Sequence, residues 1–71
     1  MDIETCVTLI DNNVGRNVIM EIKRMGSENK ETIIGTIIEP FSHEDSPSCK
    51  VETDGIPDEI FLGEILSIDF A

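Results

Sequence analysis

The spacing of apolar residues changes once along this chain of 71 residues, and that change limits the possible folds most strongly. Before Asn13 the apolar side chains recur at every third or fourth position, as Ile3, Cys6, Val7 and Ile10. This spacing places them on one side of a helix. After Gly15 apolar and polar residues alternate, which is the period of a strand with one buried face. The sequence therefore predicts a short N-terminal helix within residues 2–13, followed by strands.

Alternation and turn residues together predict five short strands after the helix, over roughly residues 16–24, 32–38, 49–53, 59–62 and 65–70. Gly35 in mid-strand predicts a bend where another segment comes close, and in the last strand Leu66, Ile68 and Phe70 are expected to face the core. So many strands on so few residues cannot form two full sheets. We expect a single mostly β domain over residues 1–71, in which the helix precedes a strongly bent five-stranded antiparallel sheet or small barrel.

The net charge excludes several classes of function. The chain has 15 acidic and 5 basic residues, so its formal net charge is −10. A nucleic-acid surface must neutralise phosphates with Lys and Arg, and an anionic membrane attracts basic segments. The composition therefore argues against direct binding of either. Partners are expected to be proteins, basic ones among them.

The two cysteines, Cys6 and Cys49, sit among apolar residues, so burial in the core is the preferred interpretation. Two cysteines are few for a secreted disulfide scaffold, and no signal-peptide pattern or apolar run of membrane-spanning length is present. We therefore expect a cytoplasmic or nuclear location with both thiols reduced.

No catalytic or cofactor-binding pattern stands out. His43 with Glu44, Asp45 and Cys49 lacks the ligand spacing of a closed zinc set. The stretch 11–15 lacks the alternating ligands of a calcium loop and is interpreted as the end of the helix. We therefore expect no catalytic residue, no metal site and no cofactor, and a protein that is not an enzyme.

Three segments carry a resemblance to the Sm and Sm-like (LSm) family. Leu9-Ile10-Asp11 followed by Val14-Gly15-Arg16-Asn17-Val18 resembles the passage from the helix to the first strand in LSm subunits. Gly35-Thr36-Ile37-Ile38 resembles the second strand of the first family motif, and the segment from Phe61 to Ile68 resembles the second motif. The family fold is an N-terminal helix before a bent five-stranded sheet, which agrees with the periodicity.

The RNA-binding residues of that family are missing here. The family loop after the second strand carries an Asp, an apolar residue and an Asn, whereas residues 39–47 contain no Asn and are acidic. The Arg-Gly-Asn of the second motif is replaced by Leu62-Gly63-Glu64. Because uridine recognition needs stacking, amide hydrogen bonds and a cation near phosphate, we expect no nucleic-acid-binding site and set aside an RNA-binding ring subunit.

The resemblance implies that the edges of the sheet are used instead. Sm proteins pair the fourth strand of one subunit with the fifth strand of the next, which is a form of strand addition. The corresponding partner-interface residues are Glu59, Ile60, Phe61, Leu62, Ile65, Ser67 and Asp69. Degenerate Sm-fold proteins of this kind are similar to the Gemin subunits of the SMN complex, which assists spliceosomal snRNP assembly and hence mRNA splicing. The implied function is a non-catalytic scaffold that forms a heterodimer with another Sm-like subunit.

An acidic inhibitor or adaptor, of phage or bacterial origin, is the alternative function. Such a protein would occupy the basic nucleic-acid site of its target. Long-range charge attraction is screened above roughly 0.15 M ionic strength, so this alternative predicts steep salt dependence of binding. A scaffold held by strand pairing predicts weak salt dependence.

Overall fold

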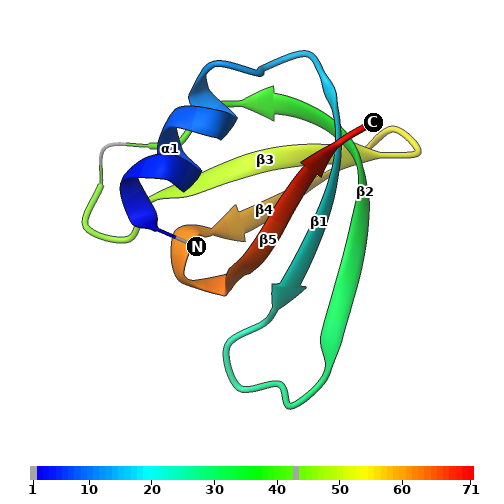
Figure 1. Cartoon of the computed structure of the whole chain (residues 1–71). Helices are drawn as coiled ribbons and strands as arrows, with labels where there is room; N and C mark the ends of the chain where they lie inside the picture. Colours follow the sequence, from blue (N-terminus) through cyan, green and yellow to red (C-terminus); the bar gives the residue numbers. More distant parts are fainter. Residues whose placement is uncertain (1, 43) are drawn as a thin grey trace.

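The computed structural model describes residues 2–42 and 44–71 and contains the predicted helix and five strands. The elements are α1 (Ile3–Asp11), β1 (Asn17–Lys23), β2 (Lys30–Glu39), β3 (Ser48–Thr53), β4 (Ile56–Phe61) and β5 (Ile65–Phe70). A single 3-10 turn, η1 (Leu62–Glu64), joins β4 to β5. Helix α1 lies across one end of the curved sheet (Figure 1). The mostly β fold class predicted from the sequence is confirmed.

The helix begins and ends where its polar residues predict. Asp2 is the N-cap, and its carboxylate accepts hydrogen bonds from the hydroxyl and the backbone N–H of Thr5 at 2.9 and 3.3 Å. These bonds, the side-chain bond first, lower the pKa of Asp2. At the other end, Asn13 donates its amide to the carbonyl of Leu9 at 2.6 Å. Gly15, three residues after the C-cap Asn12, takes a positive φ of 93° in the turn that leads to β1.

The sheet is antiparallel throughout and its strand order is β4-β3-β2-β1-β5. Strands β4 and β5 are therefore the two edges and do not pair with each other, so the predicted closure into a barrel is wrong. The turn η1 carries the chain from one edge to the other without joining them. At two positions the outer main-chain groups of β4 are bonded to the side chains of Arg24 and Glu64, which leaves β4 without a continuous row of groups to pair with β5.

Two glycines allow a tight turn between β3 and β4 and a close approach between β2 and β3. Asp54 and Gly55 have φ angles of 52° and 80° and form the two-residue turn between these strands. At Gly35 a β-carbon would collide with the carbonyl of Glu52 and the hydroxyl of Thr53. The expected close approach at Gly35 is thus confirmed, and it lets β2 bend over β3.

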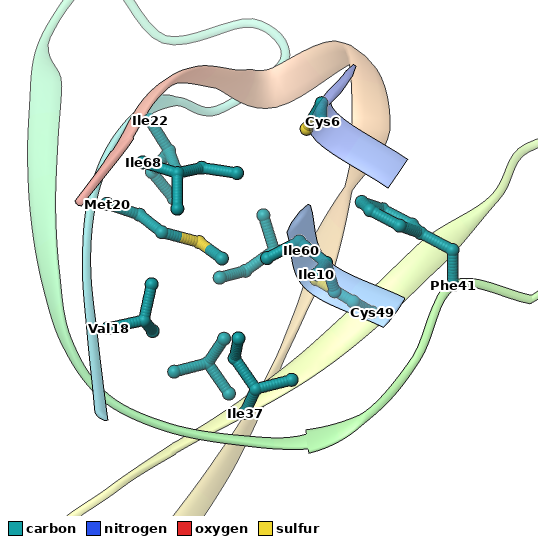
Figure 2. Packing of buried hydrophobic residues seen from close by; sticks show 11 residues of the cluster. Cys6, Ile10, Val18, Met20, Ile22, Ile37, Phe41, Cys49, Ile60 and Ile68 are labelled. Atoms are coloured by element: carbon teal, nitrogen blue, oxygen red, sulfur yellow. The ribbon is translucent and has the colours of Figure 1, made fainter. Parts of the chain in front are cut away.

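The core lies between α1 and the concave face of the sheet (Figure 2). In β1 the side chains of Val18, Met20 and Ile22 are fully buried and alternate with exposed residues, as their spacing predicts. Helix α1 contributes Cys6 and Ile10. The other buried apolar residues are Ile37, Phe41, Cys49, Val51, Ile60 and Ile68.

Strand β5 departs from simple alternation. The register against β1 shifts between Ser67, which pairs with Glu21, and Ile65, which pairs with Ile22. Leu66 is the extra residue of this bulge and is 41% exposed, so the prediction that it faces the core is wrong. Ile65 packs against the core instead, whereas Ile68 is buried as predicted and Phe70 is half-buried against the core.

Candidate interaction edges

The seven residues predicted to meet a partner lie on or beside the two edge strands. Glu59, Ile60 and Phe61 belong to β4, Leu62 opens η1, and Ile65, Ser67 and Asp69 belong to β5. Because β4 and β5 are opposite edges, these residues form two separate lines and not one surface. The side chain of Ile60 is fully buried, so it stabilises the core and has no exposed area for a partner.

The turn between β3 and β4 decides which main-chain groups of β4 point away from the sheet. Thr53 and Ile56 flank the two-residue turn and form a hydrogen-bonded pair, and such pairs alternate with unbonded ones along an antiparallel ladder. Pro57, Glu59 and Phe61 occupy the unbonded positions, so their main-chain groups face the open edge.

At each of these three positions, one of the two main-chain groups is either missing or already bonded to a side chain of the same chain. Pro57 has no N–H to offer. The carbonyl of Glu59 accepts a hydrogen bond from Nη1 of Arg24 at 3.1 Å. The N–H of Phe61 donates to Oε1 of Glu64 at 3.0 Å. The outer side of β4 therefore retains only an interrupted row of free groups.

Arg24 and Glu64 hold this arrangement together with Asp58, and we call these three residues the Arg24–Glu64 clasp. Arg24 lies 2.6 Å from Asp58, 3.8 Å from Glu64 and 3.4 Å from a further carboxylate, Glu31. Partial burial lowers the pKa of Arg24, but the bond to Asp58 and the three negative charges outweigh it, so the pKa lies above its usual value.

Glu64 is the one buried acidic residue in the described part of the chain, with 5% of its surface exposed. Its second carboxylate oxygen accepts the N–H of Met25 at 3.2 Å, so both oxygens bind main-chain donors. The only sign of Glu64 in the sequence is that it stands where the second Sm motif has Asn. Nothing local in the sequence links Arg24 to Asp58, which is 34 positions away, and the clasp was therefore not predicted.

The opposite edge, β5, has no such cover. The N–H of Ala71 bonds to the carbonyl of Asn17 at 3.4 Å, which makes these two a hydrogen-bonded pair. Alternation along the ladder then bonds Asp69 to β1 and turns the main-chain groups of Ile68 and Phe70 outward. Among the described residues, no side chain hydrogen-bonds to the main chain of β5.

The side chains around β5 differ between its two faces. On the outer face, exposed Asp69 lies opposite Ile19, which is 37% exposed, and Glu21 is the next outward residue of β1. On the inner face, Ile65 and Phe70 pack at the margin of the core. The guanidinium of Arg16 lies over the Phe70 ring, 5.1 Å from its centre.

The remaining candidate groups are His43 and the two cysteines. His43 lies outside the described residues, and the groups that are described contain no cluster of three His, Cys, Asp or Glu side chains able to hold a metal ion. Cys6 and Cys49 are free and buried. Burial raises the pKa of both thiols, that of Cys49 to about 12, which keeps both in the unreactive thiol form at neutral pH.

Comparisons with protein-family models, with curated proteins and with solved structures found no match to this chain. The resemblance to the Sm-like topology therefore rests on the helix and the five-stranded antiparallel sheet that follows it. In the described residues, no helix is long and apolar enough to cross a membrane.

Proposed function

We propose that this chain is a non-catalytic protein-interaction domain that binds an extended strand of a partner protein along β5. The observation that carries the proposal is the outer side of β5, where the main-chain groups of Ile68 and Phe70 point away from the sheet and no side chain within residues 2–42 and 44–71 is bonded to them. A strand added here gains main-chain hydrogen bonds, and its side chains meet the two faces of β5. The exposed Leu66 adds apolar contact area at one end.

The chemistry of the two faces defines the partner strand. Side chains on its inner face would lie beside Ile65 and Phe70, which favours apolar residues. Side chains on its outer face would lie beside Asp69, with Glu21 one strand further. Together with the net charge of −10, this favours Lys or Arg on the outer face. The proposed occupant is an extended segment in which apolar and basic residues alternate.

The resemblance to Sm-like proteins suggests another Sm-like subunit of a ribonucleoprotein-assembly complex as the natural source of this strand. The prediction that β4 also meets a partner stays a prediction. Strand β5 is the better supported edge, because β4 is occupied by the clasp.

One observation favours the second candidate function, an acidic inhibitor of a basic nucleic-acid-binding protein. Two of the cations are already paired within the chain, Arg24 with the clasp carboxylates and Lys50 with Glu39 at 3.6 Å. These pairs leave the net charge at −10 and leave fewer free cations to repel a basic target, so the chain presents a strongly negative charge. Because the proposed β5 strand also carries cations, amide exchange with the partner bound separates the two, since slowed exchange at Ile68 and Phe70 supports the scaffold and unchanged exchange along β5 supports the inhibitor.

A synthetic peptide tests the proposed strand site directly. The full chain, labelled with 15N, is titrated with a blocked peptide of alternating Val and Lys, and with a matched peptide of alternating Val and Glu. The Val/Lys peptide is expected to slow amide exchange at Ile68 and Phe70 at least about tenfold, whereas the Val/Glu peptide leaves it unchanged. Unchanged exchange along β5 with the Val/Lys peptide would overturn the proposal.

A pair of charge variants provides the matched control. Asp69→Lys reverses the charge on the outer face of β5 and is expected to weaken the Val/Lys peptide at least about fivefold. Glu28→Lys makes the same change of charge in the exposed turn between β1 and β2 and is expected to weaken it less than about twofold. Equal weakening by both variants would show that the peptide follows net charge alone and not the β5 edge.

A further inference from the structure

We infer that the Arg24–Glu64 clasp seals the β4 edge, so that this chain accepts a single strand, along β5, and forms one-to-one complexes in place of rings or filaments. This inference rests on the proposed function, because it defines how many partners the interaction domain can hold. The seal itself is a property of the free chain and can be examined without any partner.

A sheet with two free edges allows head-to-tail association. If the β4 edge of one chain paired with the β5 edge of the next, each subunit would use two different surfaces, and such contacts produce rings or open filaments. Both edges must then offer main-chain donors and acceptors. Strand β5 offers them at Ile68 and Phe70.

Strand β4 does not offer a continuous set of these groups. Each outward position lacks one of its two groups, because Pro57 has no N–H, the Glu59 carbonyl is bound by Arg24, and the Phe61 N–H is bound by Glu64. An incoming strand would have to displace both side chains to form a regular ladder. The edge is thus protected by the chain itself, which is how natural sheets avoid edge-to-edge association.

Displacing the clasp is unfavourable because its charges are partly or fully buried. The side chains of Arg24 and Glu64 are 28% and 6% exposed. Opening the clasp would leave the Glu64 carboxylate without its two main-chain donors and Arg24 without Asp58 beside it. A buried charge that loses its partners is strongly destabilising.

A second copy of this chain is a poor occupant for the remaining edge. Two chains would bring together net charges of −10 each. Their β5 strands would also place one Asp69 close to the other, and like charges on neighbouring strands repel. The single open edge is therefore suited to a partner of opposite charge.

Amide exchange of the free chain tests the seal. In the wild type, the Phe61 amide is expected to exchange at least about tenfold more slowly than the Ile68 and Phe70 amides, after correction for intrinsic rates. Glu64→Ala removes both acceptor oxygens and is expected to abolish that difference, whereas Glu28→Ala, in an exposed turn, preserves it. Rapid exchange of Phe61 in the wild type would overturn the inference.

Stoichiometry with the Val/Lys peptide tests the valence. Native mass spectrometry of the wild type is expected to show one peptide per chain, and a second peptide is expected to bind to the double variant Arg24→Met, Glu64→Ala, which removes both side chains bonded to β4. Where the double variant fails to fold, the stoichiometry of the wild type alone decides between one strand and two. Two peptides on the wild type would overturn the single valence while leaving the proposed function intact. If no peptide binds along β5, both the proposed function and the single valence are wrong. Slow exchange of the Phe61 amide in the free chain would even then show that the β4 edge is sealed.

Discussion

The guanidinium of Arg24 and the carboxylate of Asp58 lie 2.6 Å apart, and this ion pair ties the turn after β1 to the edge strand β4. Both side chains are partly exposed, at 28% and 37%. Water and salt therefore screen much of the attraction between them.

We predict that Asp58→Asn lowers the free energy of unfolding by less than about 1 kcal/mol, and that this difference shrinks at high salt. Glu64→Ala is predicted to cost about 2 to 3 kcal/mol at either salt concentration, because it removes a buried side chain and leaves the partly buried N–H groups of Phe61 and Met25 without their acceptors. Urea unfolding of both variants at low and high salt measures these values. A larger loss for Asp58→Asn than for Glu64→Ala would contradict the description of the clasp.

A second prediction compares a glycine in a crowded place, Gly35 in β2, with a glycine in an open one, Gly63 in η1. Gly35→Ala places a methyl group against the main-chain carbonyl of Glu52, which cannot move without shifting β3. We expect a loss of about 1 to 3 kcal/mol, as for other over-packed sites. Gly63→Ala is the control, because no atom of the described residues lies within 4 Å of its β-carbon position, and its effect should stay below about 0.5 kcal/mol. Thermal unfolding of the two variants side by side measures the difference.

The buried thiol of Cys49 makes stability depend on pH in the alkaline range. Burial, with a smaller contribution from the charge of Cys6, raises its pKa from 9.0 to about 12. The folded state therefore keeps the proton that the unfolded state loses, so stability is complete below pH 9 and falls as the pH rises from 9 towards 12. The expected slope is up to about 1.4 kcal/mol per pH unit.

Other groups titrate in the same range, so a variant isolates the thiol. Cys49→Ala removes the ionisable group and is expected to show a shallower decline between pH 9 and 10.5 than the wild type in urea unfolding. Parallel curves for the two proteins would show that Cys49 does not ionise differently on unfolding.

Local rules were enough to predict most of the fold. The spacing of three and four in α1 and the alternation of Val18, Met20 and Ile22 in β1 each reflect a single buried face, so they can be recognised without knowing the neighbours. The Asp54-Gly55 pair specifies its turn through two positive φ angles.

The features that sequence patterns missed depend on contacts between distant segments. Barrel closure was expected because it removes free edges, but the side chains of Arg24 and Glu64 cover one edge by another route. Both edge strands were assigned correctly as the outer strands, yet the occupation of β4 follows from a residue 35 positions from Glu59. No periodicity in a single strand carries that information.

The bulge in β5 is the clearest example, and it leads to the last prediction. Alternation alone places Leu66 and Ile68 on one face, but the register shift exposes Leu66 at 41% and leaves Ile68 at 7%. We predict that Ile68→Ala lowers the free energy of unfolding by about 2 to 4 kcal/mol, because it leaves a cavity beside Met20, the residue of β1 that pairs with Ile68. Leu66→Ala is predicted to cost less than about 1 kcal/mol, because most of the surrounding space is solvent. Urea unfolding distinguishes the two cases, and equal losses for both variants would mean that β5 alternates without a bulge in solution.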